Sequence, residues 1–303
     1  MSDLIKIAVD AMGGDGSPKK IIDGIIFNHS SNKNNFFKIF GDKKKINPII
    51  NGKIPEKFFE IIHTENKIES TDSPLEGAKR GKDTSMWLAI QSVRNKEADI
   101  VISAGNTGAL LVVSKLNLKM IENIDKPALS ALWPNKKGMS VVLDLGANIE
   151  CSSKNLLDFS IMGASLYTSL YSPEKPNVAL LNIGSEELKG NETIKETYQL
   201  LNEKKSDNYN FAGYIEGNHL MDGLVNVIVS DGFTGNVALK TAEGTANFIT
   251  SELKNAMTGT LLGKISSLLN ISNLKKFKKR LDPRLYNGAI FIGLDSPVVK
   301  SHG

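Results

Sequence analysis

Residues 98–111, ADIVISAGNTGALL, predict the type of fold. The apolar residues 100–102 indicate a short buried strand, the small and polar residues 103–108 indicate a turn, and the apolar residues from Ala109 onward indicate a helix. A strand that passes through a short turn into a helix is the repeating unit of α/β folds with a parallel sheet. We therefore expect an α/β protein.

The turn of this stretch also predicts an anion site. The first backbone N–H groups of a helix have no acceptor within the helix, and the helix dipole favours negative charge there. Gly105 and Gly108 lack a Cβ, so the backbone can approach a ligand closely. Ser103, Asn106 and Thr107 add side-chain donors. The alternative is a plain connection capped by Thr107. Both interpretations stay open, because the spacing matches neither a Walker A loop nor G-x-G-x-x-G.

The composition is that of a globular protein. The 303 residues, 41% apolar and 23% charged, allow one large α/β domain or two smaller ones, and we expect one catalytic domain over residues 1–303. A net charge of +4 is too small to indicate nucleic acid binding. The single cysteine excludes an internal disulfide and fits the cytoplasm. We expect neither a signal peptide nor a membrane span, since no apolar run approaches about 20 residues.

A turn of small and polar residues also follows four other predicted strands. Residues 4–10, 139–143, 177–182 and 225–229 are apolar runs that lead into segments rich in glycine and polar residues, the last of them before a helix predicted over residues 237–248. One such turn alone does not distinguish a binding site from a structural turn. Because a doubly wound sheet brings strand ends to one cleft, five together predict a polar cleft in a three-layer α/β/α sandwich. The candidate ligand-binding residues are Gly13, Gly14, Asp15, Ser103, Ala104, Gly105, Asn106, Thr107, Gly108, Asp144, Asn148, Asn182, Gly184, Glu186 and Gly232.

Two segments carry dense positive charge. Residues 256–281 contain two amphipathic stretches, which are typical of helices on an anionic bilayer; the alternative is a helical pair packed on the core with a solvated basic face. Residues 79–82 either bind phosphate or an acidic partner or form a solvated loop, and the lysine run 43–45 indicates a solvated loop. The candidate surface residues are Lys79, Arg80, Lys82, Leu261, Leu262, Ile265, Leu268, Leu269, Lys275, Lys276, Phe277, Lys278, Lys279 and Arg280.

Seven segments of the chain resemble the bacterial acyl carrier protein:phosphate acyltransferases of phospholipid synthesis. They occur in the order found in that family and are VDAMGGDGSP, KDTSMWLAI, VISAGNTGALL, LDLGANIEC, NIGSEELKGN, VSDGFTGNVALK and VVKSHG. The resemblance covers almost the whole chain. It implies a membrane-associating helical projection at residues 256–281 and a further helix after VVKSHG, where this sequence stops.

The resemblance also implies a fold and a reaction. The fold would be similar to those of phosphotransacetylases and of isocitrate and isopropylmalate dehydrogenases, in a homodimer. The reaction would form acyl phosphate from inorganic phosphate and a long-chain thioester of acyl carrier protein, with no metal or other cofactor. The product would pass to a membrane glycerol-3-phosphate acyltransferase, so we expect a cytoplasmic protein associated peripherally with the inner face of the cell membrane.

A mechanism follows from this resemblance. Because phosphate is the nucleophile, the enzyme needs no Ser–His–Asp or Cys–His set; it has to hold phosphate against the thioester carbonyl, stabilise the oxyanion and help the thiolate leave. We expect phosphate at residues 103–109, with lysines that neutralise developing charge and with aspartates, among them Asp15 and Asp144, that orient phosphate or those lysines. The candidate catalytic residues are Lys189, Lys240, Asp231, Asn236 and Asp10.

Three alternatives stay open at this point. A phosphotransacetylase-like enzyme would use a coenzyme A thioester in place of the carrier protein. A decarboxylating dehydrogenase of similar fold would need a divalent metal and a nicotinamide cofactor. A non-enzymatic membrane adaptor would use the amphipathic stretches but would leave the polar strand ends without a role.

Overall fold

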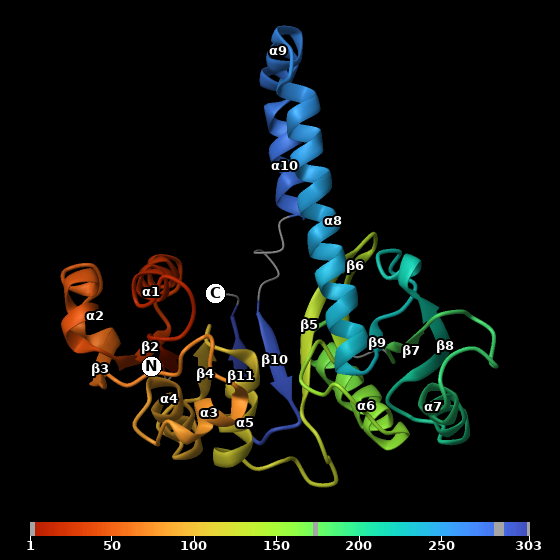
Figure 1. Cartoon of the computed structure of the whole chain (residues 1–303), viewed down its shortest axis with the longest axis horizontal. Coiled ribbons are helices and arrows are strands. Elements are labelled where there is room, and N and C mark those ends of the chain that lie inside the picture. Colours follow the sequence, from red (N-terminus) through yellow and green to blue (C-terminus); the bar gives the residue numbers. More distant parts are fainter. Residues whose placement is uncertain (1–3, 172–174, 282–287, 302–303) are drawn as a thin grey trace. The chain divides into compact units, whose positions relative to one another are not determined.

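Strands and helices alternate along most of the chain (Figure 1). The computed structural model describes residues 4–171, 175–281 and 288–301. The chain forms two compact units: unit 1 contains the residues up to 130 and those from 288 onward, and unit 2 contains residues 131–287. Strand β5 (Ala128–Asn135) pairs with β10 through its first residues and with β6 through the others, so it contributes to the sheets of both units.

The sheet of unit 1 has the strand order β3-β2-β1-β4-β11-β10-β5. Neighbours from β3 to β11 are parallel, whereas β10 is antiparallel to both β11 and β5. The strands of this unit, besides β5, are β1 (Ile5–Asp10), β2 (Asn35–Gly41), β3 (Phe59–His63), β4 (Ile100–Ser103), β10 (Ala289–Ile292) and β11 (Val298–Lys300). Its helices are α1 (Lys19–Ser31), α2 (Lys43–Ile50), α3 (Pro74–Lys79), α4 (Ser85–Arg94) and α5 (Thr107–Asn117), with the 3₁₀ helix η1 (Glu56–Phe58).

The sheet of unit 2 has the strand order β5-β6-β9-β7-β8. The pair β5–β6 is antiparallel and the remaining pairs are parallel. The strands of this unit, besides β5, are β6 (Gly138–Leu143), β7 (Asn177–Asn182), β8 (Asn210–Glu216) and β9 (Val227–Val229). Its helices are α6 (Ser153–Leu170), α7 (Glu192–Glu203), α8 (Gly232–Thr258), α9 (Leu261–Leu269) and α10 (Ile271–Leu281), with the 3₁₀ helix η2 (Gly217–His219).

The core of unit 1 lies between helices α1 and α2 and the sheet. Ile22 of α1, Ile39 of β2 and Ile46 of α2 are fully buried in one apolar cluster. Ile22 and Ile25 are three residues apart and therefore lie on the same face of α1, which is the face that packs on the sheet. Because the helices cover the face of the sheet, the carboxyl ends of its strands remain at the edge, where α/β folds bind ligands.

The expected α/β fold is confirmed, with differences in two segments. The lysine run 43–45, predicted to be a loop, forms the first turn of α2, because Asp42 caps this helix by accepting a hydrogen bond from Lys44 N. The helix predicted over residues 237–248 is longer and runs from Gly232 to Thr258 as α8, because Asp231 caps it where the sequence indicated a turn. A capping aspartate starts each helix earlier than the apolar pattern indicated.

Helices α9 and α10 follow the far end of α8 (Figure 1). Ser267 Oγ of α9 donates a hydrogen bond to the carbonyl oxygen of Met257 in α8, at 3.1 Å. Leu262, Leu268 and Leu269 of α9 are 80%, 67% and 83% exposed, so they do not pack on the core of unit 2. No helix among the described residues is both long and apolar enough to cross a membrane. The predicted surface residues whose side chains lie outside the described part of the structure are Leu261, Lys278, Lys279 and Arg280.

Candidate functional site

The carboxyl ends of β1 and β4 bring two predicted site residues together. The strands are parallel neighbours, and their register places Asp10 opposite Ser103. The Asp10 carboxylate accepts hydrogen bonds from Ser103 Oγ at 2.7 Å and from Ser85 Oγ, at the start of α4, at 2.6 Å. Ser103 Oγ in turn accepts one from Gly105 N at 3.1 Å. A buried carboxylate thus fixes the beginning of the loop 103–108.

Asp10 lies beneath this loop. Its residue surface is 1% exposed. Burial raises the pKa of its carboxyl group above the ordinary value, because desolvation outweighs the hydrogen bonds from Ser85 and Ser103 that favour the charged form. The hydrogen bonds of Asp10 hold the loop in place, and its predicted catalytic role stays a prediction.

Two glycine-rich loops pack backbone against backbone above Asp10. A Cβ added at Gly13 would lie 2.5 Å from Asp10 Oδ2 and 2.8 Å from Gly105 N, closer than real Cβ atoms come. Gly14 has a φ of +85°, and a Cβ there would lie 2.8 Å from the carbonyl oxygen of Ala104. The predicted residues Gly13, Gly14 and Gly105 therefore meet in one place, and the first two positions require glycine.

A pocket of about 390 Å³ opens where these loops meet the start of α5. Thr107 and Gly108 form the first turn of this helix, whose N–H groups have no acceptor one turn earlier and whose dipole favours an anion. The pocket therefore has the chemistry of a site for a small anion. It is lined by Gly14, Asp15, Ser70, Ala104, Gly105, Asn106, Thr107, Gly108 and Lys300.

Asn106, and not Thr107, caps α5. Its Oδ1 accepts a hydrogen bond from Ala109 N at 3.0 Å, while its Nδ2 donates to the carbonyl oxygens of Ser70 and Asp72, each at 3.1 Å. The interpretation with Thr107 as the cap is wrong, because the Asn106 amide serves both the helix end and the neighbouring loop. The amide thus forms part of the pocket wall with its polar atoms engaged within the protein.

Sequence reasoning missed Ser70 and Lys300 among the residues that line the pocket. The register of β11 against β4 places Lys300 opposite Ser103, and its Nζ lies 3.5 Å from the carbonyl oxygen of Ala104. Lys300 thus brings positive charge to the predicted anion site. The only signal for it was the VVKSHG segment of the family resemblance, whose last two residues, 302–303, lie outside the described residues.

In unit 2, the turn after β6 gathers four of the predicted residues. The Asp144 carboxylate, fully buried, accepts hydrogen bonds from the backbone N–H groups of residues 146–148 and from Asn148 Nδ2, at 2.7–3.2 Å. Gly232 N, at the start of α8, donates to the carbonyl oxygen of Asn148 at 2.8 Å. A Cβ at Gly146 would meet Asn236 Nδ2 at 2.5 Å. This turn and the first turn of α8 therefore form one packed cluster built around a carboxylate.

The first half of α8 carries two further catalytic candidates. Asp231 caps the helix, and its carboxylate accepts hydrogen bonds from Thr234 N at 2.7 Å and from Thr234 Oγ1 at 2.8 Å. Lys240 lies farther along the helix, and its Nζ pairs with the Glu243 carboxylate at 3.0 Å. A carboxylate thus occupies the start of α8, and the lysine charge has an acidic neighbour.

The loop after β7 holds Lys189. Asn182 Nδ2 donates hydrogen bonds to the carbonyl oxygens of Gly184 and Lys189, each at 3.1 Å, so the side chain at the strand end fixes both ends of this loop. A Cβ at Gly184 would lie 2.8 Å from Glu186 Oε2 and 3.1 Å from Lys189 Cγ. The predicted residues of this loop are therefore brought together, with the Lys189 side chain exposed.

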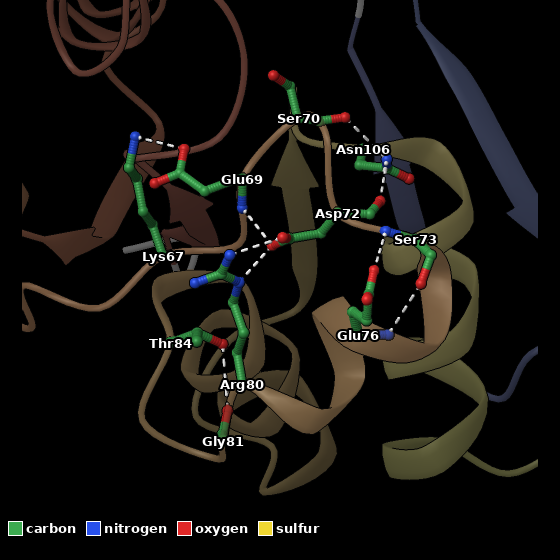
Figure 2. Close-up of polar contacts among 10 residues, drawn as sticks. All are labelled: Lys67, Glu69, Ser70, Asp72, Ser73, Glu76, Arg80, Gly81, Thr84 and Asn106. Atoms are coloured by element: carbon green, nitrogen blue, oxygen red, sulfur yellow. Dashed lines mark hydrogen bonds and ion pairs between the residues drawn. The ribbon is translucent and has the colours of Figure 1, made fainter.

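The three basic candidates near α3 differ from one another. Lys79 and Lys82 are exposed. The Arg80 guanidinium instead donates hydrogen bonds from Nε and Nη2 to the two carboxylate oxygens of Asp72 (Figure 2). Arg80 is therefore committed to a contact within the chain.

Comparison with known proteins places these features in a family. The family model described as "Fatty acid synthesis protein" matches residues 5–303. A phosphate acyltransferase of Pelagibacter ubique (strain HTCC1062) is 78% identical over all of this chain and 91% of its own length. A phosphate acyltransferase of Maricaulis maris (strain MCS10) is 42% identical over all of this chain and 87% of its own length.

Solved structures show a similar fold. The EutD phosphotransacetylase from Staphylococcus aureus matches 99% of this chain and 88% of its own with a TM-score of 0.63 at 14% identity. A branched-chain phosphotransacylase from Enterococcus faecalis V583 matches 98% of this chain and 92% of its own with a TM-score of 0.60 at 13% identity. At this identity the likeness shows the fold alone. From the family model and the sequence relatives, the chain belongs to the phosphate acyltransferase family and is an acyltransferase enzyme of fatty acid and phospholipid synthesis.

Proposed function

We propose that this protein transfers the acyl group of a long-chain acyl carrier protein thioester to inorganic phosphate. A phosphate oxygen attacks the thioester carbonyl carbon and forms a C–O bond, the C–S bond breaks, and the thiolate takes up a proton. The products are acyl phosphate and the free carrier protein. Within the family, the observation that carries this proposal is the pocket at the start of α5, because its chemistry suits phosphate.

In this proposal, unit 1 supplies the groups that hold phosphate. The N–H groups of Thr107 and Gly108, together with the α5 dipole, stabilise its negative charge. The ammonium group of Lys300 adds an opposite charge. Asp15, which also lines the pocket, orients phosphate by accepting a hydrogen bond from its protonated oxygen. Phosphate held by these groups presents its nucleophilic oxygen in a fixed direction.

Lys189 and Lys240 are the proposed groups that neutralise charge as the oxyanion forms and the thiolate leaves. Lys189 lies on a loop that Asn182 fixes, so its backbone has a defined position. Lys240 pairs with Glu243, which offsets its charge. These contacts support Lys189 over Lys240 for this role.

We further propose that the exposed basic and apolar surfaces contact the carrier protein and the membrane. Lys79, Lys82 and Lys275 are exposed and suit an acidic carrier protein, so association should slow as salt rises. The exposed leucines 268 and 269 of α9 suit the surface of an anionic bilayer. A homodimer at the inner face of the cell membrane, which passes acyl phosphate to a glycerol-3-phosphate acyltransferase, completes the proposal.

One assay tests this proposal. The protein is incubated with phosphate and long-chain acyl carrier protein, with and without anionic liposomes, and acyl phosphate is trapped as the hydroxamate. We expect acyl phosphate and free carrier thiol in equal amounts. A parallel reaction with the same acyl group on coenzyme A separates the donors: faster turnover with coenzyme A would favour the phosphotransacetylase-like alternative. Absence of acyl phosphate with either donor would reject the proposal.

A further inference from the structure

Residues 69–80 lie against the start of α5 and contribute to the phosphate pocket (Figure 2). The Asn106 amide that caps α5 also binds the carbonyl oxygens of Ser70 and Asp72, each at 3.1 Å. Ser70 in turn lines the pocket. One side chain therefore connects the first turn of α5 with a segment that lies more than 30 residues earlier, and the position of the Ser70 wall depends on that segment.

The segment has a rigid internal frame. The Asp72 carboxylate accepts hydrogen bonds from Arg80 Nε, from Arg80 Nη2 at 2.6 Å and from Glu69 N at 2.8 Å, so it joins both ends of the segment. Between them, Ser73 and Glu76 form a capping box at the start of α3. Arg80 thus closes a loop whose other end carries Ser70.

Helix α3 is also packed on α5. A Cβ added at Gly77 would lie 3.0 Å from Ala109 Cβ, and a Cβ at Gly108 would lie 2.6 Å from Pro74 Cγ. The two helices therefore approach closely at the first turn of α5. The frame around Arg80 is therefore connected to the residues that line the pocket through α3 and through Asn106.

The charges of this segment also favour the contact between Arg80 and Asp72. Glu69, Asp72 and Glu76 give the segment three carboxylates, whereas only Ser70 of this segment lines the pocket. The Arg80 guanidinium holds the pKa of the Asp72 carboxyl below its ordinary value, and Asp72 in turn raises the pKa of Arg80. The Asp72 side chain is 10% exposed and the Arg80 side chain is 44% exposed. The positive charge of Arg80 is therefore directed at Asp72, and the contact with a carrier protein that the sequence suggested stays a prediction.

We propose that Arg80 is a positioning residue for phosphate: through Asp72 it holds Ser70 and Asn106 in the wall of the pocket. This inference rests on the proposed function in placing phosphate at the start of α5. Because the guanidinium binds both carboxylate oxygens, the geometry of a fork is required as well as the charge. Arg80 itself does not touch phosphate.

Steady-state kinetics of Arg80→Ala, with phosphate and the acyl donor varied separately, test this role. We expect the KM for phosphate to rise about tenfold, as for the loss of one member of a coupled network, while the KM for the acyl donor stays within twofold. Arg80→Lys keeps the charge but loses the fork, so its KM for phosphate should lie closer to that of Arg80→Ala than to that of the wild type. Lys67→Ala is the matched control, because it removes an exposed ion pair to Glu69, at the other end of the segment, and should leave both constants unchanged.

Titration of the full chain with inorganic phosphate by calorimetry separates this inference from the proposed function, since it needs no turnover. Weaker phosphate binding in Arg80→Ala, with a melting temperature close to that of the wild type, supports the inference even if the acyl donor is misassigned. Wild-type phosphate affinity in both Arg80 variants overturns it. A rise confined to the KM of the acyl donor also overturns it and makes Arg80 a carrier contact. If Arg80→Ala does not fold, Arg80→Lys carries the same test.

Discussion

Helices α5 and α8 both begin where a parallel strand ends, yet the two helix starts have different chemistry. In α5 the capping group is the neutral amide of Asn106, and the Asp10 carboxylate is buried beneath the preceding loop. In α8 the capping group is the Asp231 carboxylate, which accepts two hydrogen bonds from Thr234. A negative charge therefore already occupies the start of α8, whereas the start of α5 opens into a pocket.

The difference shows how one backbone pattern serves two purposes. A carboxylate at a helix N-terminus satisfies backbone donors and interacts favourably with the dipole, but it repels a second anion. An amide satisfies the same donor without charge and leaves the dipole available to a ligand. The charge of the cap therefore distinguishes these two helix starts, which the recurrence of small polar residues at strand ends does not.

The largest effect is expected from Gly13→Ala, which would disrupt the packing of the loop after β1 against the loop that precedes α5. The new Cβ would lie 2.5 Å from Asp10 Oδ2 and 2.8 Å from Gly105 N, and the backbone neighbour cannot move away without shifting the pocket. We expect a loss of stability of about 1–3 kcal/mol, as for overpacking. We also expect acyl phosphate formation to fall roughly 100-fold or more, since a misplacement of about 1 Å has effects of this size. Thermal unfolding and the hydroxamate assay measure the two effects.

Gly24→Ala is the matched control for this substitution. Gly24 lies in helix α1, and a Cβ there would meet nothing within 4 Å. Because alanine favours the helix over glycine, this variant should be fully active and at least as stable as the wild type. If Gly13→Ala were as active as Gly24→Ala, the close packing of the two loops would not be needed for phosphate binding.

A smaller effect is expected from Asn106→Asp, which gives α5 the kind of cap that α8 has. The new carboxylate can still accept the hydrogen bond from Ala109 N, but it cannot donate to Ser70 and Asp72, and it places negative charge in the pocket wall. We expect the affinity for phosphate to fall roughly 10- to 100-fold, while the helix stays formed. Calorimetric titration with phosphate and circular dichroism check the two parts of this prediction.

The same substitution at another helix controls for the added charge. Asn191 caps α7 by accepting a hydrogen bond from Ile194 N at 2.9 Å, and it is not among the residues that line the pocket at the start of α5. Asn191→Asp should keep the wild-type affinity for phosphate, and the new charge should favour α7 through the helix dipole. Equal losses of phosphate affinity in the two variants would mean that the cap of α5 has no special role.

The sequence predicted local features of this comparison well and long-range features poorly. The strands, the turn 103–108 and the helix after it follow from apolar periodicity and from glycine, which act over a few neighbouring residues. The contact of Asn106 with Ser70 joins residues far apart in the chain, and Lys300 reaches the pocket only because β11 pairs with β4. Such contacts depend on the folded topology, and the sequence pattern around either partner does not contain them.

The smallest effect is expected from the Asp10 carboxylate beneath the loop 103–108, and it appears in the pH dependence of the free energy of unfolding. Burial raises the pKa of Asp10, so between its ordinary value of 3.8 and the raised value the folded protein binds more protons than the unfolded chain. This group therefore reduces stability as pH rises through that window. Asp10→Asn removes the titration, so the free energy of unfolding of the variant, compared with that of the wild type, should increase with pH across the window.

For Asp72→Asn we expect the stability difference from the wild type to change with pH in the opposite direction. Arg80 lowers the pKa of Asp72, so the unfolded chain binds more protons there, and the stabilisation from this carboxylate is present above the ordinary pKa of 3.8 and is lost as pH falls through the lowered value. The advantage of the wild type over Asp72→Asn should therefore shrink on acidification. Urea unfolding at a series of pH values measures both slopes. For each variant, the slope is that of its free energy of unfolding relative to the wild type, plotted against pH. Slopes of the same sign for Asp10→Asn and Asp72→Asn would contradict a raised pKa for Asp10 and a lowered pKa for Asp72.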